Sequence, residues 1–398
     1  MADKPRFDGE RVKLGDVCTI VSGATPKTKT GEYWDGEIKW VTPAELDNDS
    51  HYISDTEKHL TEAGYKSASL HMMPKGTVLL TTRAPIGKVA IAAEEMSCNQ
   101  GFKNLVCSSA INNEFLYLYL KSRAAELQAM GRGATFKELS KKNVAGFEIN
   151  LPAIDRQLDA VAKLTAVGNQ IARAKQQHDQ LDTLVKSRFV EMFGGALSIE
   201  NKWDSSILEN CVESLESGKS PSCKNVSRKG LDPGVLKLSA LSSGRFLPGE
   251  NKAMLDGETI IQAKEVKQGD ILVARKNTPQ LVGSCVLVRE DVTNLMFPDI
   301  VFRMHPNDSV NGEYLAALLS GPSYSSKVRG LAHGSNKSMS NIPKSELAKL
   351  SIPLPPLSLQ QQFADFVAQV DKSRFVVLNG KISRIQLISR RIAHRYSR

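Results

Sequence analysis

Two long stretches of the chain carry apolar residues at steps of three and four. The first covers residues 157–193, and the second covers the last forty residues, 359–398. Such spacing places the apolar side chains along one stripe of an α-helix. Because one helix cannot bury a stripe of this length by itself, we expect the two helices to pair as an antiparallel coiled coil. The positions that we expect to bury against each other are Leu158, Ile171, Leu181, Phe366, Val370 and Ile385.

A region of shorter apolar runs precedes each long helix. Residues 77–82 and 88–92 in the first half, and residues 270–274 and 284–288 in the second, are apolar or alternating. Glycine, proline and polar loops separate them, as is typical of β-strands. Each half therefore predicts a β-rich body that ends in a long helix, so the fold class is α+β.

The two halves carry the same motifs in the same order. Each opens with Ser-Gly-x-Thr/Ser-Pro, at residues 22–26 and 217–221. Each continues with a glycine turn, a strand, a polar loop, a glycine and a second strand, at residues 74–92 and 266–288. Later matches are "FLYLYLKS" with "YLAALLSG", both short helices by pattern, and "GRGATFKELSKKNV" with "AHGSNKSMSNIPKSEL". Self-similarity of this kind indicates a tandem repeat.

Both halves also end in the same transition. It reads "FEINLPAIDRQ" at residues 147–157 and "LSIPLPPLSLQ" at residues 350–360. Proline lacks the N–H that a sheet ladder needs, so it stops the last strand of the body before the long helix begins. The expected segments are a first body (1–154), a central spacer helix (155–195), a second body (196–356) and a C-terminal spacer helix (357–398).

Charge and composition indicate a binding partner. The formal net charge is +9, with a pI near 9.1, which favours a polyanion. The last forty residues hold eight Lys and Arg against two Asp, a net of six positive charges. The chain has no apolar run long enough to span a membrane and no signal peptide at its start, so we expect a cytoplasmic protein without membrane contact.

The motifs for catalysis are incomplete. "SGKS" at residues 217–220 has Glu213 where a phosphate-binding loop needs glycine. The only Pro-Pro pair, Pro355–Pro356, lies between two leucines and cannot belong to the Asn-Pro-Pro-aromatic motif of amino-methyltransferases. The six cysteines form no CxxC pair, and no Cys/His spacing is typical of a metal site. We therefore expect a binding protein with no catalytic residues and no metal.

The repeated motifs resemble those of a known family. The paired Ser-Gly openings, "KGTVLLTTRAPIGKVAI", the "GATFKEL" loop, and above all "INLPAIDRQ" and "IPLPPLSLQQQF" resemble the specificity subunit of type I restriction-modification enzymes. The resemblance covers nearly the whole chain. The second half departs from it slightly, with "LEN" where the first has "LGD", and its last helix is unusually basic.

The resemblance implies a non-catalytic role in a larger complex. In this family two target recognition domains are held apart by two long helices, and each domain reads one half of a bipartite, asymmetric site in double-stranded DNA. The helices dock two adenine methyltransferase (modification) subunits, and two motor-nuclease (restriction) subunits join for cleavage. Those partners use S-adenosylmethionine, ATP and magnesium, so no cofactor is expected in this chain. The alternative is an interaction scaffold that binds protein or RNA.

The polar loops beside the strands are the expected DNA contacts. Lys, Arg and hydroxyl groups contact phosphates, while Arg, Lys, Asn and Gln read base edges. Arg83 and Arg275 are the expected base contacts, and the two later loops matter most because small residues allow close backbone approach. The candidates are Thr25, Lys27, Lys29, Arg83, Lys88, Arg132, Thr135 and Lys137 in the first half, with counterparts Lys219, Ser220, Lys224, Arg275, Lys276, Asn336 and Lys337 in the second.

Overall fold

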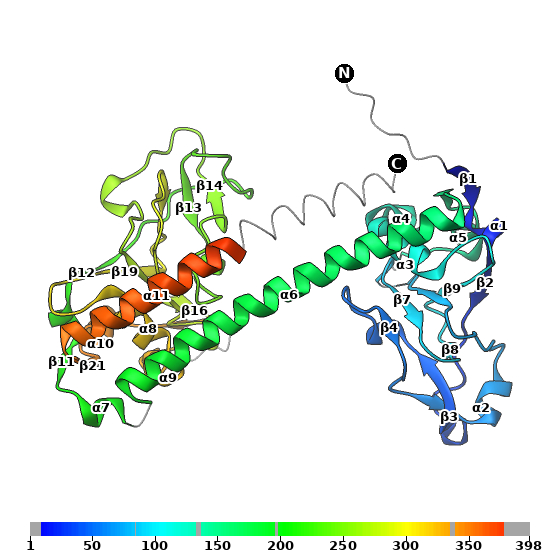
Figure 1. The fold of residues 1–398 in the computed structure, drawn as a ribbon, viewed down its shortest axis with the longest axis horizontal. Coiled ribbons are helices and arrows are strands. Elements are labelled where there is room, and N and C mark those ends of the chain that lie inside the picture. Colours follow the sequence, from blue (N-terminus) through cyan, green and yellow to red (C-terminus); the bar gives the residue numbers. More distant parts are fainter. Residues whose placement is uncertain (1–8, 84, 133–136, 196–197, 335–338, 378–398) are drawn as a thin grey trace. The chain divides into compact units, whose positions relative to one another are not determined.

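The computed structural model describes residues 9–83, 85–132, 137–195, 198–334 and 339–377 (Figure 1). The chain divides into two compact units, whose described parts are residues 9–175 and 176–377. Each unit holds a mixed β-sheet body with short helices, so the α+β class and the tandem organisation expected from the sequence are confirmed. No helix in the described ranges combines the length and the apolar character that crossing a membrane requires.

The main sheet of unit 1 has four antiparallel strands, with one short parallel strand at its edge. Two of its interior strands, residues 78–80 and 89–92, are apolar at every position, because both faces of the sheet are covered. Val78 and Leu80 pack on the same side as helix α3 (Asn113–Ser122), whereas Leu79 packs on the opposite side with Phe102. In spatial order the strands are β2 (Cys18–Ser22), β9 (Lys103–Cys107), β6 (Val78–Leu80), β7 (Val89–Ala92) and β4 (Tyr52–Ile53).

Unit 2 repeats this order with different residues. Its main sheet runs β12 (Val212–Ser217), β19 (Val301–Pro306), β15 (Ile271–Ala274) and β17 (Cys285–Leu287). A small second sheet is also shared. It runs β5 (His59–Leu60), β3 (Trp34–Val41) and β8 (Ser97–Cys98) in unit 1, and β14 (Asn251–Ala253), β13 (Gly234–Leu236) and β18 (Leu295–Met296) in unit 2. The repeat in sequence is thus a repeat in topology.

A buried glutamine fastens the start of each long helix to its body. Helix α6 (Ile154–Phe193) carries Gln157, and helix α11 (Leu357–Val377) carries Gln360. Both side chains are fully buried. The Gln157 amide oxygen accepts from Asn112 N–H (2.8 Å), the residue that caps α3, and its NH2 donates to Pro152 O (2.8 Å).

Gln360 makes the same contacts in unit 2. Its amide oxygen accepts from Asn311 N–H (2.8 Å), the cap of helix α8 (Gly312–Ser320), and its NH2 donates to Pro355 O (2.7 Å). The strand before each proline is paired with the first strand of its body. These pairs are β1 (Glu10–Lys13) with β10 (Glu148–Leu151), and β11 (Ser205–Ile207) with β21 (Ser351–Pro353).

Within unit 2, α11 lies antiparallel along the C-terminal part of α6 (Figure 1). Phe189 and Phe363 meet edge-on with ring centroids 5.4 Å apart, and Asp182 pairs with Arg374 at 2.6 Å. Residue numbers therefore increase along α6 in the direction in which they decrease along α11. Of the residues expected to pair, Phe366 lies under the guanidinium of Arg188 (5.8 Å), and Val370 is buried.

The other residues that we expected to pair between the two long helices differ in their exposure. Leu181 and Ile171 are half-buried, and Ile385 lies outside the described residues. The expectation for Leu158 is wrong, since its side chain is 50% exposed. In this first part of α6 the helix buries Ala160 against the body of unit 1, and Leu158 lies off that face.

Candidate nucleic-acid interface

The candidate residues gather where the strands of each main sheet end, at the edge that runs across the strands and not along an outer strand. Strands β2 and β6 both run antiparallel to β9, so their C-terminal ends lie at the edge where β9 begins. The loop with Thr25, Lys27 and Lys29 follows β2, and Arg83 follows β6. Strands β12 and β15 have the same relation to β19, which brings the loops that carry their counterparts to one edge of unit 2.

Glycine lets the Ser-Gly loop pass close to the neighbouring chain. A Cβ on Gly23 would lie 1.9 Å from Asn99 O, and a Cβ on Gly218 would lie 2.1 Å from Phe297 O. Contacts that short exclude any side chain at either position. The next residue donates its N–H to the same segment in both units, from Ala24 to Cys98 O (3.0 Å) and from Lys219 to Phe297 O (3.1 Å).

The side chains after these glycines divide into hydroxyl and ammonium groups. The Thr25 hydroxyl bonds to the Gln100 side chain, and the Ser220 hydroxyl bonds to the Asp299 carboxylate. The ammonium groups reach solvent, because Lys27, Lys29 and Lys219 are exposed. Each loop thus has a fixed backbone and free positive charge, which suits contact with phosphates.

A short ribbon in unit 1 presents three exposed cations. Arg83 and Arg132 each form an antiparallel bridge with Glu138. Arg132 N–H donates to Glu138 O (3.1 Å), and Glu138 N–H donates to Arg132 O (2.9 Å). Arg83, Arg132 and Lys137 are exposed. Thr135 lies outside the described residues, as do Asn336 and Lys337 at the matching place in unit 2.

Two of the predicted lysines are engaged with the protein. The Lys88 ammonium donates to Leu46 O, and Lys224 pairs with Asp256 at 2.7 Å. These contacts direct both amines toward their own bodies, in contrast to the exposed lysines at positions 27, 29 and 137.

The pairing of strands shows which residues of the two units are equivalent. Arg275 N–H donates to Ile300 O (2.9 Å), as Thr82 N–H donates to Gly101 O (2.7 Å). Lys276 pairs with Asn341 in the same way that Arg83 pairs with Glu138. The two expected base contacts, Arg83 and Arg275, therefore do not lie at equivalent positions. Arg83 corresponds to Lys276, and Arg275 corresponds to Thr82, because the sheet register rather than the residue type sets the equivalence.

Arg275 is held firmly at this edge. Its guanidinium lies over the Phe302 ring, with 5.3 Å to the centroid. Nε donates to Asn341 Oδ1 (3.1 Å), and Nη1 donates to Ser217 Oγ (3.4 Å). An arginine fixed on three sides has already lost much of its side-chain freedom, so little more is lost on binding.

The acid beside this position is neutralised within the protein. Glu216 precedes Ser217 on β12, and its carboxylate pairs with both Lys264 and Arg303. Although burial opposes ionisation, the hydrogen bonds from Lys264 and Arg303 lower the pKa of Glu216 below its ordinary value. A carboxylate compensated by two cations repels an approaching phosphate little.

Lys103 is a residue that the sequence analysis missed. It opens strand β9, and its side chain is only 11% exposed. Its ammonium lies 3.8 Å from the Glu138 carboxylate and 3.3 Å from Phe102 O. The available signal was a lysine between Phe102 and the apolar run that begins at Leu105, in a buried strand where a charge is rare unless it is paired or has a function. Among the described residues, no group of three His, Cys, Asp or Glu could hold a metal ion.

The chain matches known proteins along most of its length. A family profile described as "Type I restriction modification DNA specificity domain" matches residues 8–183 and 201–387. The type I restriction enzyme MjaIX specificity subunit of Methanocaldococcus jannaschii is 36% identical over 189 residues, which is 47% of this chain and 44% of that protein. The EcoEI specificity subunit of Escherichia coli is 28% identical over 160 residues, 40% of this chain and 27% of that protein. The matches thus span less than half the length of these two relatives.

Two solved structures share the fold over the whole chain. The type I restriction-modification S subunit from M. genitalium has a TM-score of 0.57 at 11% identity, covering 100% of this chain and 98% of that chain. A chain from the structures that describe complex assembly and conformational transition of the type I R-M system has a TM-score of 0.56 at 18% identity, covering 99% of both. With the family profile matched in both halves, the tandem bodies and long helices described above place this chain in the type I restriction-modification DNA specificity family.

Proposed function

We propose that this chain is the sequence-specific DNA-recognition subunit of a type I restriction-modification complex. Each body reads one half of a bipartite site in double-stranded DNA. The observation that carries the proposal is the basic edge of each main sheet, where the loops after β2 and β6, or after β12 and β15, bring their cations together. Membership of the specificity family supports the same reading.

The two half-sites differ in sequence. One topology presents two different sets of side chains at the same places, with Arg83, Glu138 and Arg132 in unit 1 and Lys276, Asn341 and His333 in unit 2. Base recognition depends on which donors and acceptors reach the groove. Two bodies that share a topology but carry different side chains at equivalent positions therefore bind an asymmetric site.

The chain directs chemistry that its partners perform. Two adenine methyltransferase (modification) subunits and two motor-nuclease (restriction) subunits assemble with it in the cytoplasm, and S-adenosylmethionine, ATP and magnesium are bound by those subunits. Adenine methylation then takes place at the site that this chain selects. Cleavage follows recognition of that site. The relatives' own designation as specificity subunits supports this division of labour.

Selection from a random duplex library tests the proposal. The purified chain is used alone and co-expressed with its neighbouring methyltransferase, and bound duplexes are sequenced. We expect two short motifs around an unread gap of fixed length. A single continuous motif would mean that one body alone reads DNA. Absence of enrichment in both preparations would contradict DNA recognition and favour a scaffold that binds protein or RNA.

A further inference from the structure

The same point at the edge of the two main sheets holds a cation, but different strands supply it. In unit 1 the cation is Lys103, the first residue of β9, whose cross-strand partner is Ser22. In unit 2 the position of Lys103 is taken by Phe302, whose cross-strand partner is Ser217. There the cation is Arg275, from the end of β15, which covers Phe302.

The partners of the two cations are equivalent. Lys103 lies beside Glu138, and Arg275 donates to Asn341. Glu138 and Asn341 occupy the same place in the ribbon, since Glu138 bridges to Arg83 as Asn341 pairs with Lys276. Each cation therefore lies between the serine that ends β2 or β12 and the same residue of the ribbon.

Among the described residues, both cations keep donors that make no hydrogen bond. The described contacts of Arg275 take Nε and one proton of Nη1, so the end of the guanidinium, with Nη2 and the second Nη1 proton, remains available. The Lys103 ammonium has three protons, and its two neighbours are long contacts of 3.3 and 3.8 Å. A side chain that is nine-tenths buried and weakly partnered is poorly stabilised in the free protein.

We propose that Lys103 and Arg275 are the base-reading cations of the two bodies, and that each recognises a guanine by its O6 and N7 atoms. This inference rests on the proposed function and names residues within it. Lysine and arginine donate to these two acceptors on the major-groove edge of guanine, and arginine can do so with two parallel bonds. Arg83 and Lys276, which are equivalent to each other and directly follow Thr82 and Arg275, contact phosphate instead.

The geometry separates the two roles. Arg275 is fixed by a ring and two hydrogen bonds, as base reading requires, because a donor that must match two acceptors cannot be free to move. Arg83 is exposed and has no such support among the described residues. An unsupported cation at the surface suits a phosphate, which accepts a bond from many directions and carries no sequence information.

The test repeats the library selection with single variants and measures affinities for the selected duplexes. Arg275→Lys keeps the charge and loses the fork, and Lys103→Met keeps the length and loses the charge. We expect each to relax one position in one half-site, with discrimination against the wrong base falling about tenfold or more. The other half-site keeps its motif, which shows that the variant chain is folded and binding.

Matched controls are Arg83→Gln and Lys276→Gln. They should lower affinity evenly for all sequences and leave both motifs unchanged. Asn341→Ala should relax the same position as Arg275→Lys, because it removes the group that orients the guanidinium. Lys103→Arg, which keeps a cation, should retain a preference for guanine.

Two failures can be told apart. If the wild-type chain selects no split motif, the proposed function is wrong. If the wild-type chain selects a split motif but Arg275→Lys and Lys103→Met weaken binding equally for every sequence, then DNA recognition stands and these cations are phosphate contacts. If the wild-type motif has no guanine at the positions that Arg275→Lys and Lys103→Met relax, the inference is also wrong.

Discussion

Single buried residues determine where each body ends and its helix begins. Gln157 and Gln360 lie 203 residues apart by number, yet they bond to the same two places, the N–H of the asparagine that caps α3 or α8 and a proline-segment carbonyl. Each therefore satisfies a backbone N–H at the start of α3 or α8 and a carbonyl of the proline segment, neither of which has another hydrogen-bond partner among the described residues. This explains why both transitions carry glutamine three residues into the helix.

Replacing one glutamine should loosen one body only. Gln157→Leu leaves the Asn112 N–H and the Pro152 carbonyl without a partner in a buried place, at a cost of about 2–3 kcal/mol. Hydrogen exchange in α3 should accelerate, while α8 is unchanged, and Gln360→Leu should give the reverse. Gln362→Ala, at an exposed position of α11, is the control. Equal acceleration in both helices would contradict the assignment.

The glycine of the Ser-Gly loop should be intolerant to substitution. Gly23→Ala puts a methyl group 1.9 Å from the backbone oxygen of Asn99, so the loop must move away from the end of β8. We expect affinity for the first half-site to fall about tenfold or more while the second is retained. Gly31→Ala, where nothing lies within 4 Å, is the matched control. Gly218→Ala and Gly249→Ala form the same comparison in unit 2, and wild-type affinity in Gly218→Ala would show that the loop takes no part.

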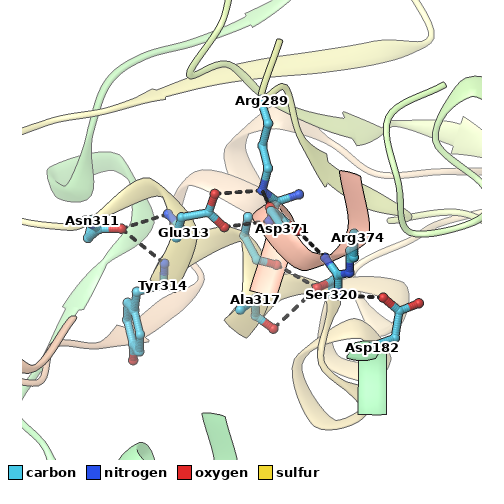
Figure 2. A network of polar contacts seen from close by, with 10 residues as sticks. Asp182, Arg289, Asn311, Glu313, Tyr314, Ala317, Ser320, Asp371 and Arg374 are labelled. Atoms are coloured by element: carbon cyan, nitrogen blue, oxygen red, sulfur yellow. Dashed lines mark hydrogen bonds and ion pairs between the residues drawn. The ribbon is translucent and has the colours of Figure 1, made fainter. Parts of the chain in front are cut away.

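At the scale of elements, a chain of ion pairs joins the helix pair to the body of unit 2 (Figure 2). Arg374 on α11 pairs with Asp182 on α6 (2.6 Å) and with Asp371 (2.5 Å). Arg289, after β17, pairs with Asp371 (3.4 Å) and with Glu313 on α8 (2.5 Å). Although burial opposes its charge, the surrounding carboxylates raise the pKa of Arg289.

This network of ion pairs lies where the repeat would place apolar residues between the two long helices. By the register of the two glutamines, Arg374 corresponds to Ile171 and Asp182 corresponds to Ile385. The expected stripe is thus apolar at these positions in one half of the repeat and charged in the other. A polar layer in a helix pair specifies which partner and register are accepted, usually at some cost in stability.

Removing the charge of Asp182 should loosen the helix pair of unit 2. Asp182→Asn weakens pairs with Arg374 and Arg245, and Arg374 is only 16% exposed. We expect a loss of about 1–2 kcal/mol, measured as faster hydrogen exchange in α11. Raising the salt concentration should accelerate exchange in the wild type more than in the variant. Asp179→Asn, an exposed acid one turn earlier, should have no effect; a similar loss there would argue against a specific network.

At the scale of the whole molecule, the repeat produces two bodies with one topology. The residues at the ends of their main-sheet strands differ, as the proposed recognition of two unlike half-sites requires. Helix α6 is a single element of 40 residues that passes from unit 1 into unit 2. A continuous helix has a fixed rise for each residue, and the proposed function therefore predicts that the length of α6 sets the separation of the half-sites.

Lengthening α6 should widen the unread gap. Four residues inserted after Gln176 add about 6 Å of helix, which is close to two base-pair steps. We expect the library-selected gap to grow by one or two base pairs while both half-site motifs persist. The insertion also rotates one end of the helix by about 40° beyond a full turn, so affinity should fall somewhat. An unchanged gap would rule out α6 as the ruler.

The residue pattern by itself determined the architecture. Apolar runs bounded by glycine and proline gave the central strands, steps of three and four gave α6 and α11, and the doubled motifs gave the repeat and the family. Each of these signals is local, because strand and helix periodicity is written in neighbouring residues. Most of the predicted contact loops also reach one sheet edge, since each was placed directly after a strand.

Only the tertiary structure decided which side chains meet. Arg83 and Arg275 were both expected to contact bases, but the strand register makes Arg275 the counterpart of Thr82 and not of Arg83. Lys103 was overlooked, because nothing local shows that it lies beside Glu138, 35 positions later. Leu158 was assigned to the helix seam, but α6 turns its neighbour Ala160 toward the body of unit 1. These results have one physical cause: the partner of a side chain is set by long-range packing and, in a sheet, by strand register, which neighbouring residues in the sequence do not specify.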